Sequence, residues 1–98
     1  MAETIDDITM DYEQDGTQLV KEVDKEILSR GVWTTIMFKY QNWDKAKEEF
    51  GDTQISIRRY QKSNNEYKQR SKFNISRKQA PKVLEVLERW TSSEDMAL

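Results

Sequence analysis

The clearest hydrophobic pattern in the chain is an alternation over residues 32–41, VWTTIMFKYQ. This run is rich in β-branched and aromatic residues and contains no glycine or proline, which predicts a β-strand. A two-residue period sends alternate side chains to opposite faces of a sheet. The even-numbered residues, which include Ile36 and Phe38, are the expected core face. The other face carries Trp33, Thr35, Met37, Lys39 and Gln41.

Two more strands are predicted over residues 54–61 and 67–75, because apolar and polar residues alternate in both. A polar connection at 42–52 precedes them, and an Asn-Asn turn at 63–66 separates them. In the first strand, Ile55 and Ile57 face away from Arg58 and Tyr60. One face of the second strand is expected to carry Lys68, Arg70, Lys72 and Asn74. The opposite set comprises Tyr67, Gln69, Ser71, Phe73 and Ile75, with Phe73 and Ile75 expected in the core.

An amphipathic helix is predicted over residues 76–90, where apolar residues recur on a stripe that ends at Trp90. Ser76 and Gln79 have the spacing of a capping box, and Pro81 moves the expected start of the helix to Gln79 or Ala80. Residues 17–30 show apolar residues at three- and four-residue spacing before a glycine, which favours a second helix. The end of that segment, residues 25–29, is also compatible with an edge strand.

Together these elements predict an α+β fold, a four-stranded antiparallel sheet with a C-terminal amphipathic helix over one face. A chain of 98 residues is long enough for one domain with a thin core, so a homodimer is expected to bury more apolar surface. The predicted domain spans residues 17–90. Residues 1–16 contain six acids and no base, and are expected to form a disordered acidic arm. Residues 91–98 are a short acidic tail.

The distribution of charge indicates a function that the net charge of −2 does not, because residues 53–82 form a basic block. The block holds nine lysines and arginines against one acid, Glu66, for a net charge of +8, whereas residues 1–30 sum to −6. Phosphates respond to the local field of such a block rather than to the total charge. The acidic arm is then either a solvated tail or an intramolecular competitor for the basic block.

The absence of cysteine and histidine narrows the possible functions. It excludes disulfides and zinc–cysteine sites, and it removes the commonest general base and the commonest transition-metal ligand. With only three glycines there is no phosphate-binding loop. We therefore expect no enzyme activity, cofactor, metal or small-molecule substrate. No apolar run is long enough to span a membrane and the N-terminus is acidic, so we expect a cytoplasmic or nucleoid protein, or a nuclear one in a eukaryote.

The helix stripe covers only one face of the sheet, so the other face is expected to stay open. Cations two residues apart on a strand lie about 6 to 7 Å apart, a spacing that suits the phosphates of an extended single strand. Exposed aromatic rings among them offer stacking surfaces for unpaired bases. This combination predicts binding of single-stranded DNA or RNA with little sequence preference. The predicted contact residues are Trp33, Lys39, Arg58, Tyr60, Lys68, Arg70 and Lys72.

The runs ISIRRYQ and QRSKFNIS, the second leading directly into the helix, resemble the single-stranded-DNA-binding core of the transcriptional positive cofactor four family. The resemblance covers residues 26–90. It implies a first strand at 25–29, a strand arginine at Arg58, an aromatic at Tyr60 and a basic strand with Arg70 and Lys72. It also implies a homodimer that acts in transcription, replication or repair.

The chain departs from the family pattern at three places. Gln61 stands where the family commonly has a tryptophan, so one stacking platform is missing or replaced by Trp33. Lys72 stands in place of a glycine, and the connection at 42–52 is longer than usual. An alternative function is a regulatory module whose basic face docks an acidic protein. Salt-sensitive binding of an oligonucleotide would distinguish the first function from the second.

Overall fold

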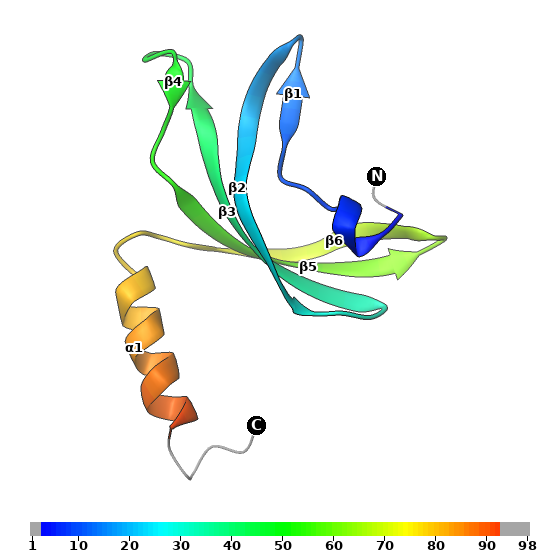
Figure 1. The fold of residues 1–98 in the computed structure, drawn as a ribbon, viewed down its shortest axis with the longest axis vertical. Coiled ribbons are helices and arrows are strands. Elements are labelled where there is room, and N and C mark those ends of the chain that lie inside the picture. The colour runs from blue at the N-terminus through cyan, green and yellow to red at the C-terminus, as the bar shows by residue number, and fades with distance from the viewer. Residues whose placement is uncertain (1–2, 93–98) are drawn as a thin grey trace.

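A computed structural model describes residues 3–92 of the protein as an α+β fold, with one curled antiparallel sheet and a C-terminal helix (Figure 1). The elements are η1 (Ile5–Asp7), β1 (Tyr12–Gln14), β2 (Thr17–Ser29), β3 (Trp33–Asp44), β4 (Glu49–Phe50), β5 (Gln54–Ser63), β6 (Glu66–Ile75) and α1 (Ala80–Thr91). The strands are ordered β1-β2-β3-β5-β6, and β4 pairs with the end of β3. The long strands β2, β3, β5 and β6 form the frame of the sheet, to which β1 and β4 are short additions.

The segment at residues 17–30 is a strand, so the helix that its apolar spacing favoured is wrong. β2 pairs antiparallel with β3 from Val20 opposite Asn42 to Ser29 opposite Thr35. Its register shifts twice, at residues 22–24 and again at 27–29. Each β-bulge inserts an extra residue and changes the face of the side chains that follow. The bulge at Val23 therefore lets Val20 and Ile27 both face the core, although they are seven residues apart. Two other apolar residues of the pattern, Val23 and Leu28, are the extra residues of the two bulges and are exposed.

The core lies on one face of the sheet. We call the face that carries Ile36 and Phe38 the inner face, and the face that carries Met37 and Ile57 the outer face. The buried core residues are Ile8, Met10, Ile36, Phe38, Tyr40, Tyr60 and Tyr67. The predicted core set of the first strand is confirmed from residue 34 to residue 40, whereas Val32 precedes β3 and is exposed.

The inner face is covered by residues 3–11, which we call the N-terminal segment. Ile8 in this segment is only 4% exposed, and Met10 is buried in the same cluster. The prediction of a disordered arm is therefore wrong for residues 3–16, because a few well-placed apolar side chains are enough to hold the segment on the sheet. The segment continues directly into β1, and a turn at Asp15 and Gly16 joins β1 to β2. Both turn residues have positive φ angles, of 53° and 81°. Such angles are typical of a tight hairpin turn.

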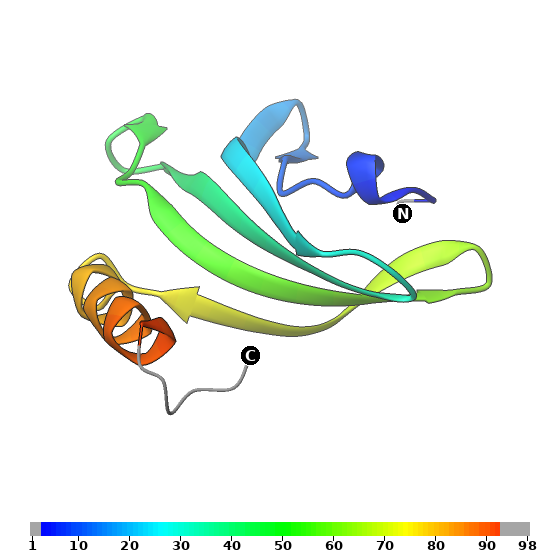
Figure 2. The same cartoon turned by 60° about the horizontal axis from the view of Figure 1, so that its bottom comes forward.

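Helix α1 lies on the opposite side of the sheet from the N-terminal segment (Figure 2). Ser76 and Gln79 form the predicted capping pair: the Gln79 amide donates to Ser76 Oγ, and the Ser76 amide donates to Gln79 Oε1. The helix begins at Ala80, as the position of Pro81 indicated. However, no residue of α1 is buried, so the expectation that it covers one face of the sheet is wrong.

The N-terminal end of α1 lies near the sheet, where Ala80, Pro81 and Leu84 share a groove with Ile55 and Ile75 on the outer face. Within residues 3–92, no helix is long and apolar enough to cross a membrane. The acidic tail expected at 91–98 falls, from residue 93 onward, outside the described residues.

Candidate nucleic-acid interface

A β-bulge at Arg70 divides the basic strand between the two faces of the sheet. Tyr60 on β5 pairs with Gln69 on β6, but the next residue, Arg59, pairs with Ser71, which leaves Arg70 as the extra residue. Before the bulge, the pairing places Lys68 opposite Gln61 on the outer face. After the bulge it places Lys72 opposite Arg58 on the inner face. The prediction that Lys68, Arg70, Lys72 and Asn74 share one face is therefore wrong.

The same bulge moves Phe73 to the outer face, opposite Ile57. Its side chain is 63% exposed, so its predicted place in the core is also wrong. Ile75 lies on the outer face too, and it is buried there beside the start of α1. A single inserted residue thus exchanges the two faces of the strand from residue 71 onward, because side chains alternate with a period of two.

Four of the seven predicted contact residues nevertheless line one cleft of about 900 Å³ between the N-terminal segment and the β5–β6 hairpin. We call it the cationic cleft. Its cations are Arg58, Lys68 and Arg70, and Tyr60 lies at its base. Its lining residues are Glu3, Asp7, Ile8, Thr9, Arg58, Tyr60, Tyr67, Lys68, Gln69 and Arg70. The two cations beside the bulge reach the cleft because β6 is the edge strand of the sheet.

Neutral hydrogen-bond acceptors hold the two arginines in place. Arg58 Nη1 donates to Gln69 Oε1 at 3.0 Å, and Arg58 Nε donates to the Ser56 hydroxyl at 3.3 Å. Arg70 Nε donates to Gln61 Oε1 at 3.0 Å. The ion pairs among residues 3–92 are Arg77–Asp52, Lys82–Glu85 and Arg89–Glu85. The two arginines of the cleft are thus oriented without being neutralised by a carboxylate of the described residues, and their charge is available to an external anion.

Tyr60 has a structural place in this site. It is 7% exposed, and burial raises the pKa of its hydroxyl above the ordinary value for tyrosine, while the neighbouring Arg58 guanidinium lowers the pKa in part. Its ring therefore offers no open surface on which a base can stack, in contrast to the sequence-based expectation. The other buried tyrosine of the cleft, Tyr67, is tied down by its hydroxyl, which donates to the Gly31 carbonyl at 3.2 Å.

An aromatic platform is present on the outer face, at the start of β3. The Trp33 side chain is 41% exposed, and the Arg59 guanidinium lies 4.1 Å from the centre of its ring. In the sheet, Trp33 pairs with Gln61, which pairs in turn with Lys68. Trp33 is thus two strands away from a cation of the cleft. Sequence reasoning missed Arg59, because it expected Arg58 and Tyr60 on the same face as Trp33. In the sheet Arg59 pairs with Thr35, so Arg59 and Trp33 share the outer face.

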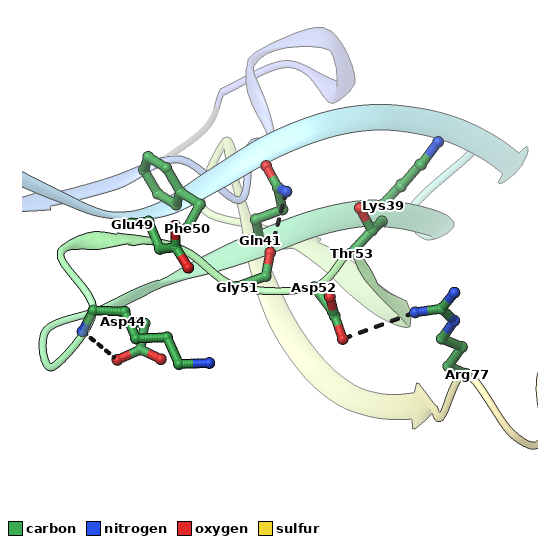
Figure 3. Close-up of a pocket in the computed structure, with 10 residues that line it drawn as sticks. Lys39, Gln41, Asp44, Glu49, Phe50, Gly51, Asp52, Thr53 and Arg77 are labelled. Atoms are coloured by element: carbon green, nitrogen blue, oxygen red, sulfur yellow. Dashed lines mark hydrogen bonds and ion pairs between the residues drawn. The ribbon is translucent and has the colours of Figure 1, made fainter.

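Lys39 and Lys72 lie away from this group. Lys39 lines a separate hollow of about 780 Å³ beside the start of α1, together with Arg77 and Asp52 (Figure 3). That hollow has mixed charge, since its lining includes three carboxylates, Asp44, Glu49 and Asp52. Lys72 is exposed on the edge strand β6. It pairs with Arg58 on the inner face but does not line the cleft.

Within residues 3–92, no group of three carboxylates is close enough together to hold a metal ion. Among the predicted contact residues, the structure brings together Arg58, Tyr60, Lys68 and Arg70, with Trp33 nearby on the other face. Gln69 is a further polar group of the cleft that the sequence did not indicate. Compared with protein-family models, curated proteins and solved structures, the chain matches none.

Proposed function

We propose that the protein binds single-stranded nucleic acid and has no catalytic role. The observation that carries this proposal is the cationic cleft, which Arg58, Lys68 and Arg70 line together. Among residues 3–92, none of these three cations has a carboxylate within ion-pair distance. Guanidinium groups that are already oriented, as in Arg58 and Arg70, bind phosphate at a low entropic cost, and the Lys68 ammonium adds a further positive charge. The resemblance of ISIRRYQ and QRSKFNIS to the positive cofactor four family agrees with the proposal.

The proposed path of the strand crosses the edge of the sheet. Phosphates lie in the cleft against Arg58 and pass over β6 beside Lys68 and Arg70. The strand then reaches the outer face, where an unpaired base stacks on Trp33 and its arginine partner Arg59. Base–aromatic stacking of this kind contributes about 1 to 3 kcal/mol per base and tolerates any sequence.

Single strands are favoured over duplex for two reasons. A duplex hides its base faces, so the Trp33 platform adds nothing to duplex binding. In addition, a path that bends around a sheet edge suits a flexible strand better than a stiff double helix. The path offers charge and stacking, with few groups that read base edges, so we expect little sequence preference. The protein then acts as a cofactor of transcription, replication or repair.

One observation favours the alternative function, docking of an acidic protein segment. Glu3 and Asp7 of the chain itself line the cationic cleft, so an acidic peptide already lies against these cations. A free acidic peptide would compete for the same surface. The two functions differ in the role of Trp33, which contributes to the first and is not needed for the second.

The test is a titration of fluorescent poly-dT, poly-U and duplex at two salt concentrations. The wild-type protein is compared with a variant that carries Arg58→Ser, Lys68→Ser and Arg70→Ser. Each phosphate contact on a single strand releases about 0.7 counterion, so the slope of log affinity against log salt should fall by roughly 2. The matched control carries Lys45→Ser, Lys47→Ser and Lys82→Ser, which removes the same charge away from the cleft and should keep most of the slope.

The Trp33→Ala variant separates the two functions. It should weaken poly-dT binding about tenfold or more through lost stacking and leave binding of poly-glutamate unchanged. Equal affinity for duplex and poly-dT, or equal loss in the cleft variant and its control, contradicts the proposal. Tight poly-glutamate binding without oligonucleotide binding supports the acidic-partner alternative.

We also propose that the protein forms a homodimer. The apolar stripe of α1 and Phe73 on the outer face are exposed in the single chain, including Leu84, Leu87 and Trp90. A patch of large apolar residues on a soluble protein marks an interaction site. A second copy of the chain presents the same stripe, and two such stripes cover each other in a symmetric dimer.

A further inference from the structure

The cationic cleft contains two acidic side chains of the N-terminal segment. We infer that this segment is a built-in competitor for the site, in which Glu3 and Asp7 lower the affinity of the cleft for polyanions. This inference rests on the proposed function, because it concerns regulation of the same cleft. It differs from the idea of a flexible acidic tail, since the segment is a fixed part of the fold (Figure 1).

Polar contacts fix the segment on the inner face. Lys25 Nζ donates to the carbonyl oxygens of Ile5, Asp6 and Ile8, at 3.0, 3.2 and 2.6 Å. Glu22 Oε1 accepts from the Thr9 hydroxyl at 3.0 Å and from the Met10 amide at 3.1 Å. These bonds bracket residue 7 on both sides along the chain. The backbone that carries the Asp7 carboxylate is therefore held at the cleft.

The two acids are held near the cations without pairing with them. Both line the same cleft as Arg58, Lys68 and Arg70, yet neither is within 4.0 Å of these cations in the ion pairs of residues 3–92. Neither carboxylate takes part in the side-chain hydrogen bonds found there. The acids therefore do not support the fold through such bonds. Their charge acts through space on whatever enters the cleft.

A phosphate in the cleft feels repulsion from these carboxylates as well as attraction to the cations. The Debye length is about 10 Å at 0.1 M salt and about 3 Å at 1 M. The repulsion therefore matters at low and physiological salt and disappears at high salt. The competitor lowers the affinity most under conditions in which non-specific electrostatic binding is strongest.

The test neutralises the acids without removing the segment. The Glu3→Gln, Asp7→Asn variant keeps the buried Ile8 and Met10 in place. The matched control is Glu13→Gln, Asp15→Asn, which makes the same charge change in β1 and its turn, where neither side chain lines the cleft. Asn suits the positive φ of residue 15, so the control keeps its turn.

Affinity for fluorescent poly-dT is then measured from about 0.05 M to 1 M salt. The cleft variant should bind about three- to tenfold more tightly than the control at the lowest salt, and equally at 1 M. Equal affinity of the two variants at every salt overturns the inference while leaving the proposed function intact. Absence of poly-dT binding by the wild-type protein and both variants overturns the proposed function itself. Unchanged thermal unfolding confirms that both variants are folded.

Discussion

At the scale of single residues, Arg70 decides where the side chains of β6 go. As the extra residue of a bulge, it leaves Lys68 on the outer face and moves Lys72 to the inner face. It also moves Phe73 out of the position that a regular strand would give it. The consequence is that two phenylalanines of the same sheet differ sharply: Phe38 is fully buried and Phe73 is mostly exposed.

Alanine substitution distinguishes these two phenylalanines. Phe38→Ala should lower the free energy of unfolding by about 3 to 5 kcal/mol, because it opens a cavity in the core. Phe73→Ala should change it by less than about 1 kcal/mol in the monomer, because the side chain already contacts solvent. Urea unfolding at low protein concentration measures both values. A large loss for Phe73→Ala would place that ring in the core and contradict the bulge.

Alternation predicted which residues of β3 share a face, but it did not fix the faces of β5. The inner positions of β3 from Thr34 to Tyr40 follow from alternation directly. Arg58 and Tyr60 were expected on the open face with Trp33, and the structure places them on the inner face instead.

The bulge at Arg70 was not predictable, because no glycine or proline marks it. Half of the candidate site depended on that bulge. Lys68 and Arg70 were chosen for their charge, and both line the cationic cleft. The face that they were expected to share with Lys72 was wrong.

At the scale of elements, the N-terminal segment has the place that the sequence assigned to the helix. The acidic composition of residues 1–16 led to the prediction of disorder, although two features indicated structure. These are the apolar residues Ile5, Ile8 and Met10 and the Asp-Gly pair at 15–16, which is typical of hairpins. Conversely, the sequence indicated the apolar stripe of α1, but the sheet of the same chain does not bury that stripe. Amphipathicity shows that a helix needs a partner without showing which one.

Lys25 is the residue on which the N-terminal segment depends. Lys25→Met keeps the length of the side chain but leaves the carbonyl oxygens of Ile5, Asp6 and Ile8 without their donor. The variant should lose about 1 to 3 kcal/mol of stability and exchange the amides of residues 5–11 faster. Urea unfolding and hydrogen exchange measure these effects. Lys45→Met, in the β3–β4 loop, is the control. Identical exchange in the two variants would contradict the anchoring role.

At the scale of the whole molecule, the chain has two unequal sides. The side with the N-terminal segment is closed over a core, and the side with α1 is open, with apolar residues on the helix and on the sheet (Figure 2). Exposed apolar surface of this kind, on the helix and on the sheet, is stabilised in water when a second molecule covers it. The cationic cleft lies on the closed side, so the proposed dimer would leave it accessible.

The proposed dimer depends on the stripe of α1. Leu84→Ser with Leu87→Ser should convert a dimer of twice 11.7 kDa into a monomer, because these side chains are exposed in the single chain. Lys82→Ser with Glu88→Ser, on the polar side of the same helix, should leave the dimer intact. Sedimentation velocity measures the mass of each variant. A monomeric wild-type protein, or a dimeric Leu84→Ser, Leu87→Ser variant, would contradict the proposal.

The position of β6 at the end of the sheet has a consequence for solubility. Among residues 3–92, no strand pairs with its outer edge, so the ten-residue strand is a template on which another strand can add. A bulge and three cations at alternate positions are the devices by which sheet proteins keep such edges from pairing. We therefore expect Lys68, Arg70 and Lys72 to prevent the β6 edges of separate molecules from pairing. Any variant that loses these charges gives up that protection, and a pairing edge left uncharged is a route to fibres.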